Sequence, residues 1–123
     1  MRTHRFVIQG RLPSLNEYIA AERSGYHAAN NMKKQCQAQI IAAARCARLR
    51  RIKKPVYICY TFYEKNRRRD KDNVSATVHK FVQDALVQAG ILGGDGWAYV
   101  TGFRDDFAID SRNPRIVVEL IEE

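Results

Sequence analysis

Asp70 and Asp72 are separated by one residue and directly follow three arginines, Arg67, Arg68 and Arg69. In an extended chain, residues two apart point to the same side, so both carboxylates can reach one centre. Carboxylates this close repel each other unless a cation lies between them, and Mg²⁺ prefers oxygen ligands. The arginines would attract a polyanion to the same place. The pattern favours metal-dependent chemistry on a nucleic-acid phosphate; the simpler alternative is a turn in which Asp72 caps a helix and Asp70 pairs with an arginine.

Asp95 and Lys80 are two further candidates for such a site. Lys80 lies two helical turns past Asn73 on the polar face of a predicted helix, where it could neutralise charge on a phosphate; otherwise it is a solvated lysine. Asp95 lies in a glycine-rich turn after that helix. The helix would be about 24 Å long. A straight helix of this length places Asp95 far from Asp72, unless the strands bring it back.

The positive charge is concentrated in the middle of the chain. The formal net charge is +8, and residues 45–71 alone hold eleven basic and two acidic residues. Residues 72–123 hold four basic and nine acidic residues. Such asymmetry indicates an anionic polymer as partner, although a solvated face is the alternative. The candidate nucleic-acid contacts are Lys33, Lys34, Arg50, Arg51, Lys53, Lys54, Arg67, Arg68, Arg69, Lys71 and Asn73.

The hydrophobic pattern predicts a single α+β domain over residues 1–123. Strands are expected over 5–10, 55–63, 99–104 and 115–121, and the two main helices over 30–49 and from Asp72 to about 89. Ser14 could cap a short helix as well. The order β-α-β-α-β-β favours one mixed sheet of about four strands packed with two main helices.

The composition excludes several other classes of protein. The sequence has no apolar run long enough to span a bilayer and no signal-peptide pattern at its start, so we expect a cytoplasmic protein without membrane contact. Cys36, Cys46 and Cys59 have no CxxC spacing and the histidines are scattered, which argues against a zinc site. We expect all three cysteines to be small buried hydrophobic residues, and no small-molecule cofactor.

Other short motifs surround the two aspartates in a definite order: Pro13-Ser14-Leu15-Asn16-Glu17-Tyr18-Ile19, Lys33-Lys34, Asp70-x-Asp72-Asn73, Lys80-x-x-x-Asp84-Ala85-Leu86, Ala89-Gly90, Asp95-Gly96-Trp97, Gly102-Phe103 and Asn113-Pro114-Arg115. In order and spacing these motifs resemble the RusA family of Holliday-junction resolvases. The similarity is greatest to the RusA-like proteins of phages and prophages in Gram-positive bacteria, and it covers nearly the whole chain.

The resemblance implies a homodimer that cuts four-way DNA junctions symmetrically with Mg²⁺ or Mn²⁺. It assigns metal binding and catalysis to Asp70, Asp72 and Asp95 and the active-site lysine to Lys80, and it implies that the fold gathers these residues. There are two departures from the best-known enterobacterial member. Lys80 lies four residues further from the DxDN motif, and Gly94 stands where that member has another aspartate.

We therefore expect a Mg²⁺-dependent, structure-selective endodeoxyribonuclease that resolves Holliday junctions by paired nicks in DNA recombination and repair. Two other functions agree with the same residues. One is a nucleic-acid-binding module without catalysis, and the other is a nuclease that acts on RNA or on other branched DNA.

Overall fold

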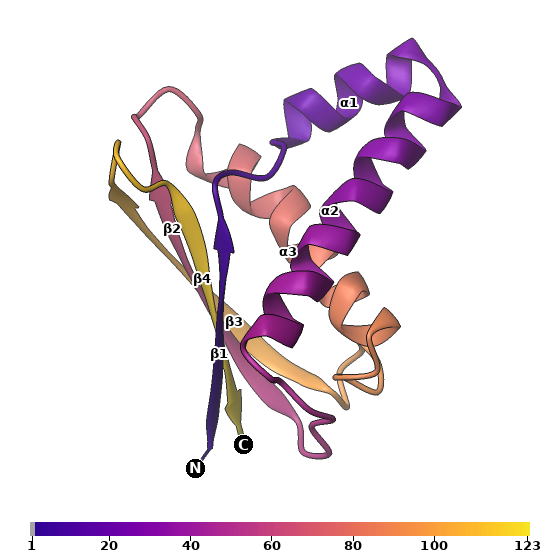
Figure 1. Ribbon diagram of the computed structural model, residues 1–123, viewed down its shortest axis with the longest axis vertical. Coiled ribbons are helices and arrows are strands. Elements are labelled where there is room, and N and C mark those ends of the chain that lie inside the picture. Colours follow the sequence, from indigo (N-terminus) through magenta and orange to yellow (C-terminus); the bar gives the residue numbers. More distant parts are fainter. Residues whose placement is uncertain (1) are drawn as a thin grey trace.

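The computed structural model describes residues 2–123 as a four-stranded sheet with three helices on one of its faces (Figure 1). The α+β class and the four predicted strands are therefore confirmed. The elements along the chain are β1 (Thr3–Gln9), α1 (Leu15–Ser24), α2 (Tyr26–Cys46), β2 (Val56–Glu64), α3 (Lys71–Gln88), β3 (Val100–Ile109) and β4 (Arg115–Glu122).

The sheet is mixed, with strand order β1-β4-β2-β3. β4 runs antiparallel to both β1 and β2, whereas β2 and β3 are parallel. Parallel neighbours need a crossover connection, and α3 supplies it. As a result, the N-terminus of α3 lies at the end of the sheet where β2 stops, and its C-terminus lies at the end where β2 and β3 begin. β3 forms one edge of the sheet and β1 the other.

The core lies between the sheet and the helices. Alternate residues of β2 from Val56 to Phe62 point to the helices and are fully buried. α3 contributes the predicted apolar stripe, in which Val74, Val78, Phe81, Val82, Ala85 and Leu86 are all buried. Because such side chains contribute about 1.5–3 kcal/mol each when buried, this stripe fixes α3 on the sheet. The packing of α3 therefore fixes the positions of the residues at its two ends.

Local signals explain where two of the helices begin and end. Ser14 caps α1 in a capping box, accepting from the backbone N–H of Glu17, as its position predicts. α2 begins four residues before the predicted position and stops at Cys46, because Arg48 adopts a left-handed φ of 61°. The prediction that all three cysteines are buried is wrong for Cys46, which lies exposed in the last turn of α2.

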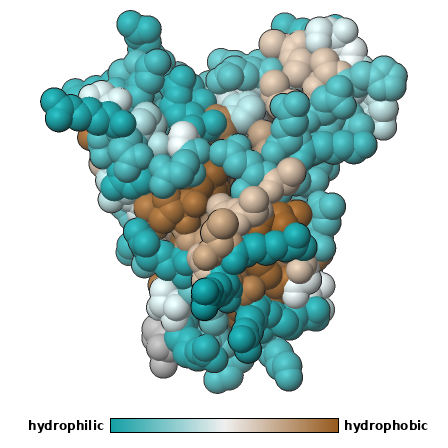
Figure 2. Space-filling view, viewed as in Figure 1, coloured by the Kyte–Doolittle hydropathy of each residue, from teal (hydrophilic) through white to brown (hydrophobic). Residues whose placement is uncertain are grey.

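α1 and the first half of α2 form a helical arm that extends beyond the sheet (Figure 1). α1 has no fully buried residue, and it packs against the core through the partly buried Tyr18. An edge-to-face contact between Tyr18 and Phe81, with ring centroids 5.6 Å apart, joins the arm to α3. Figure 2 shows the notch between this arm and the sheet, and a band of hydrophobic atoms on an otherwise hydrophilic face.

Candidate metal and nucleic-acid site

Asp70 and Asp72 lie at the N-terminus of α3 and line one open cavity of about 940 Å³. Asp70 is the N-cap residue and Asp72 is in the first helical turn, so the predicted N-cap was two residues too late. The pair is therefore not extended as predicted, yet both residues face the same cavity. Phe107 to Ile109 of β3 form the apolar wall of the cavity, and Asn66, Arg67 and Lys71 add polar groups.

Within residues 2–123, neither of these carboxylates has a side-chain partner. Asp70 makes no side-chain capping hydrogen bond, and no ion pair involves Asp70 or Asp72 in residues 2–123. Five of the 13 acidic residues lack a side-chain hydrogen bond or ion pair in this part of the chain, and Asp70, Asp72 and Asp95 are three of them. Backbone N–H groups at the helix N-terminus favour negative charge here.

The two carboxylates fit the ligand chemistry of Mg²⁺. This ion commonly binds through one or two carboxylates and keeps several waters, and the cavity is open enough to hold them. Asp70 and Asp72 would therefore supply the protein ligands. No cluster of three acidic, histidine or cysteine side chains suited to a metal exists within residues 2–123.

Arg69 has a structural role, which corrects its prediction as a phosphate contact. Its guanidinium donates to Glu64 through Nε and Nη2, at 2.9 and 3.0 Å, and through Nη1 to the carbonyl oxygen of Leu12 at 2.8 Å. Nη1 also lies 3.3 Å from Glu17 Oε1. With a side chain only 12% exposed, Arg69 ties the start of α1 to the end of β2. Arg67 and Arg68 remain exposed.

Asn73 is also used within the fold rather than left free on a polar face. Its Oδ1 accepts from the backbone N–H of Asn16, one of the unpaired N–H groups in the first turn of α1. Thr77, one helical turn past Asn73, is buried and donates to the carbonyl oxygen of Pro13 at 2.6 Å. This face of α3 is therefore covered by the segment that enters α1.

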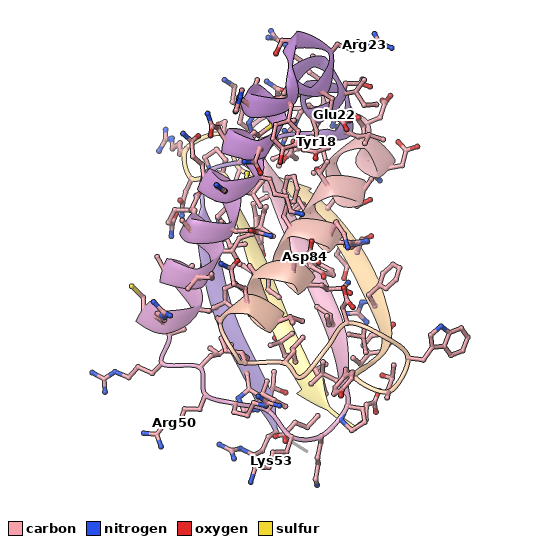
Figure 3. All side chains as sticks on the ribbon, turned by 90° about the vertical axis from the view of Figure 1, so that its right-hand side faces the viewer. Tyr18, Glu22, Arg23, Arg50, Lys53 and Asp84 are labelled. Atoms are coloured by element: carbon pink, nitrogen blue, oxygen red, sulfur yellow. The ribbon has the colours of Figure 1, made fainter. Side chains whose placement is uncertain are left out.

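Lys80 does not reach the two aspartates in a single chain. It lies eight residues past Asp72, about 12 Å along the helix axis. Its ammonium is 3.2 Å from Asp84, and its side chain is 65% exposed. Lys33 of α2 lies 3.7 Å from the same carboxylate. Asp84, which Figure 3 labels on α3, therefore forms ion pairs with both lysines. Lys34 lies in a hollow between α2 and the end of α3.

Asp95 lies at the opposite end of α3, in a hollow that also includes Gln83, Val100 and Phe103. The 18 residues of α3 separate it from Asp70, a length of about 27 Å. A single chain therefore does not bring Asp95 to the other two aspartates, as the length of the predicted helix had indicated.

The basic segment 45–71 is divided between the two ends of the sheet. Arg50, Arg51, Lys53 and Lys54 precede β2, while Arg67, Arg68 and Lys71 follow it. β2 is about 30 Å long. Figure 3 shows Arg50 and Lys53 at the end of the molecule away from the helical arm with Glu22 and Arg23. Ten of the eleven basic residues in this segment form no ion pair within residues 2–123; Arg69 is the exception.

Sequence reasoning did not identify His79 of α3 and Asp105 of β3, which form a contact between the helix and the edge strand. His79 Nε2 lies 2.7 Å from Asp105 Oδ1, and the imidazole is held between the rings of Tyr60 and Phe103, each 4.5 Å away. Burial raises the pKa of the Tyr60 hydroxyl above its ordinary range, so this group stays protonated. No sequence signal indicated the pair, because β3 was predicted to end at residue 104.

Comparison with known proteins adds no assignment: no protein-family model and no curated protein matches the sequence. Within the described part of the chain, no helix is both long enough and apolar enough to cross a membrane.

Proposed function

We propose that the protein is a Mg²⁺- or Mn²⁺-dependent nuclease that cuts branched DNA. The observation that carries this proposal is the pair of unpartnered carboxylates, Asp70 and Asp72, in an open cavity beside exposed arginines. A structural pair of aspartates in so basic a chain would be expected to form ion pairs. Cationic side chains without acidic partners, next to carboxylates without cationic partners, suit a phosphate and a divalent ion together.

Each group at the cavity has a defined task in this proposal. Asp70 and Asp72 bind the metal, which when bound lowers the pKa of a water and supplies hydroxide for attack on phosphorus. Arg67, Arg68 and Lys71 hold the phosphates on either side; such contacts position DNA without reading its sequence. Lys71 lies 5.6 Å above the ring of Phe107, a contact that favours a position of its ammonium beside the cavity.

We propose further that the working unit is a homodimer joined at β3. This strand is an edge of the sheet, and it carries two exposed apolar side chains, Phe103 at 53% and Ile109 at 50%. The other edge, β1, carries no large exposed apolar residue. An unpaired apolar edge is a template for pairing with another chain. Antiparallel pairing of two β3 strands about a two-fold axis near Arg104 and Asp105 gives a closed dimer.

The same two-fold axis would complete the site. It sets Ile109 of one copy beside Val100 of the other. The cavity with Asp70 and Asp72 adjoins Phe107 to Ile109, and the hollow with Asp95 adjoins Val100 to Phe103. Asp95 of one copy would therefore approach Asp70 and Asp72 of the other. The two halves of the basic segment 45–71 would meet in the same way.

Branched DNA is the substrate that suits such a dimer. Two equivalent sites related by a two-fold axis match the symmetry of a four-way junction and would give paired nicks. This part of the proposal is supported by the resemblance to RusA resolvases. A nuclease for RNA or other branched DNA, and a binding module without catalysis, are the alternatives that the experiment must separate.

The test uses a labelled four-way junction, a flap, a duplex and an RNA hairpin at one salt concentration, with and without Mg²⁺. We expect symmetric nicks in the junction only when Mg²⁺ is present. Asp72→Asn should abolish cleavage and leave junction binding equal or tighter, because it removes a metal ligand and a negative charge near phosphate. Glu22→Gln, which removes an unpartnered carboxylate on the helical arm, is the matched control. Cleavage by Asp72→Asn at the wild-type rate would show that the assigned role is wrong.

A further inference from the structure

Trp97 is the most exposed large hydrophobic residue that the structure describes, at 98%. It is also the only tryptophan of the chain. No aromatic pair or hydrogen bond within residues 2–123 involves it. A fully exposed indole offers a partner a large apolar face and an N–H donor.

The turn that displays Trp97 is held firmly in place. The ring of Tyr99 packs against the backbone of Gly93 and Gly94, so closely that a Cβ at either glycine would lie 2.6 or 2.8 Å from it. The N–H groups of Tyr99 and Val100 both donate to the carbonyl oxygen of Gly96, at 3.0 Å. These contacts therefore hold the backbone that carries Trp97, so that binding a partner would order only the indole side chain.

The surface beside this turn is strongly basic. Residues 47–55 hold five basic and no acidic residues. Two hydrogen bonds join the ends of this loop to the turn region: Ile52 N–H donates to Ile91, and Val56 N–H donates to Tyr99. A guanidinium nitrogen of Arg51 lies 3.2 Å from the position of a Cβ on Gly93. The loop 47–55 therefore packs against the segment that leads into the turn of Trp97, and its cations lie at the same end of the sheet as the exposed indole.

This combination indicates the class of partner. A basic groove with an aromatic side chain is the usual platform for single-stranded nucleic acid, because every base offers a face for stacking. A fully paired duplex keeps its bases covered, so the exposed ring has nothing to stack on there. A protein partner would be expected to bring acidic groups for the five cations.

We propose that Trp97 stacks on a base that is unstacked at the branch point of the DNA while the loop 47–55 holds the adjacent phosphates. The inference rests on the proposed nucleic-acid function and deepens it, since it names the part of the substrate that distinguishes a junction from a duplex. Because Trp97 is two residues from Asp95, the stacked base would lie beside the proposed cleavage site.

The fluorescence of Trp97 itself reports binding, so the test does not depend on DNA cleavage. Wild-type protein is titrated in EDTA with a dye-labelled oligo-dT, a four-way junction and a duplex, and tryptophan emission is read at equal occupancy as measured by anisotropy. We expect quenching and protection from acrylamide with oligo-dT and with the junction, and neither with the duplex. Trp97→Ala should weaken oligo-dT binding by at least about fivefold, and Trp97→Phe by less.

Tyr26→Ala is the matched control, because Tyr26 is also exposed, at 77%, but lies on the helical arm at the other end of the molecule. It should bind oligo-dT as the wild type does. Unchanged emission at saturating oligo-dT, or equal affinities of Trp97→Ala and Tyr26→Ala, would overturn the inference even if the protein cuts junctions. Blue-shifted emission of the free protein that reverses on dilution would also overturn it, since Trp97 would then be covered by a second copy. Stacking without cleavage would leave it standing and count against the nuclease.

Discussion

Arg69 and Glu64 form a two-pronged ion pair beneath the N-terminus of α3, with N–O distances of 2.9 and 3.0 Å. Their side chains are only 12% and 8% exposed, so this ion pair is largely shielded from solvent. The remaining donor of Arg69 reaches the carbonyl oxygen of Leu12. The pair thereby joins the end of β2 to the segment before α1 and supports the turn on which Asp70 and Asp72 stand.

The first prediction concerns this ion pair. Arg69→Ala leaves the buried Glu64 carboxylate with only Arg11, 4.0 Å away, as an ionic partner, and should lower the free energy of unfolding by up to about 3–5 kcal/mol. Arg68→Ala, which removes an exposed neighbour of the same type, should change it by less than about 0.5 kcal/mol. Urea denaturation measures both. If the two variants are equally stable, Arg69 is not the anchor that its contacts indicate.

The main elements of the fold could be predicted because their patterns are local. The apolar residues of α3 recur from Val74 to Leu86 on one face of the helix, and this pattern predicts which face is buried. The buried residues of β2 can be predicted from its sequence in the same way. The capping box, which spans only the four residues from Ser14 to Glu17, indicates where α1 begins. The end of β3 was missed because Asp105, Asp106 and Asp110 resemble loop residues, although the first pairs with His79 and the last with Arg115.

The site was predictable only in part, because its remaining contacts join distant segments. The pattern DxD identified Asp70 and Asp72 through their spacing alone. Nothing in the sequence showed that Arg69 would be used by Glu64, or Asn73 by Asn16, which is 57 residues away. The basic residues of segment 45–71 are close together in sequence, but β2 places them at two opposite ends of the sheet. Residue type thus named the candidates for the proposed chemistry, and topology decided which of them remain available for it.

The second prediction is a pH dependence at Glu17. Burial tends to raise the pKa of Glu17, but hydrogen bonds from Ser14 and the guanidinium of Arg69 outweigh it, so the pKa lies below its ordinary value. A carboxylate with a lowered pKa stabilises the fold above its unfolded pKa, about 4.3, and this contribution is lost as pH falls through the folded value. Glu17→Gln should therefore be less stable than wild type near neutral pH.

The measurement is the urea midpoint of both proteins from about pH 6 to pH 3. The difference between wild type and Glu17→Gln should shrink as the pH falls, and should no longer change once Glu17 is protonated. Asp110, whose pKa is lowered by a hydrogen bond from Arg115, titrates in both proteins and cancels in the difference. A difference that stays constant over the whole range would show that the charge of Glu17 contributes nothing.

The third prediction tests whether two copies build the site together. Asp72→Asn and Asp95→Asn should each be inactive alone. If Asp95 serves the partner's Asp70 and Asp72, a mixed dimer of the two variants has one site with both substitutions and one site with none. Random mixing of such dimers should restore about a quarter of the wild-type nicking rate. The products should be single nicks, because each active dimer has one working site.

A site built within one chain predicts the opposite result. Every site of the mixed dimer would then carry one substitution, and mixing would restore nothing. Mixing Asp70→Asn with Asp72→Asn is the matched control, because these residues share one cavity in one chain and leave both sites of their mixed dimer damaged under either model. Recovery in the first mixture but not in the second would place Asp95 across the interface. Recovery in neither, with subunit exchange shown by mass spectrometry, would contradict the β3-paired dimer as the source of the third carboxylate.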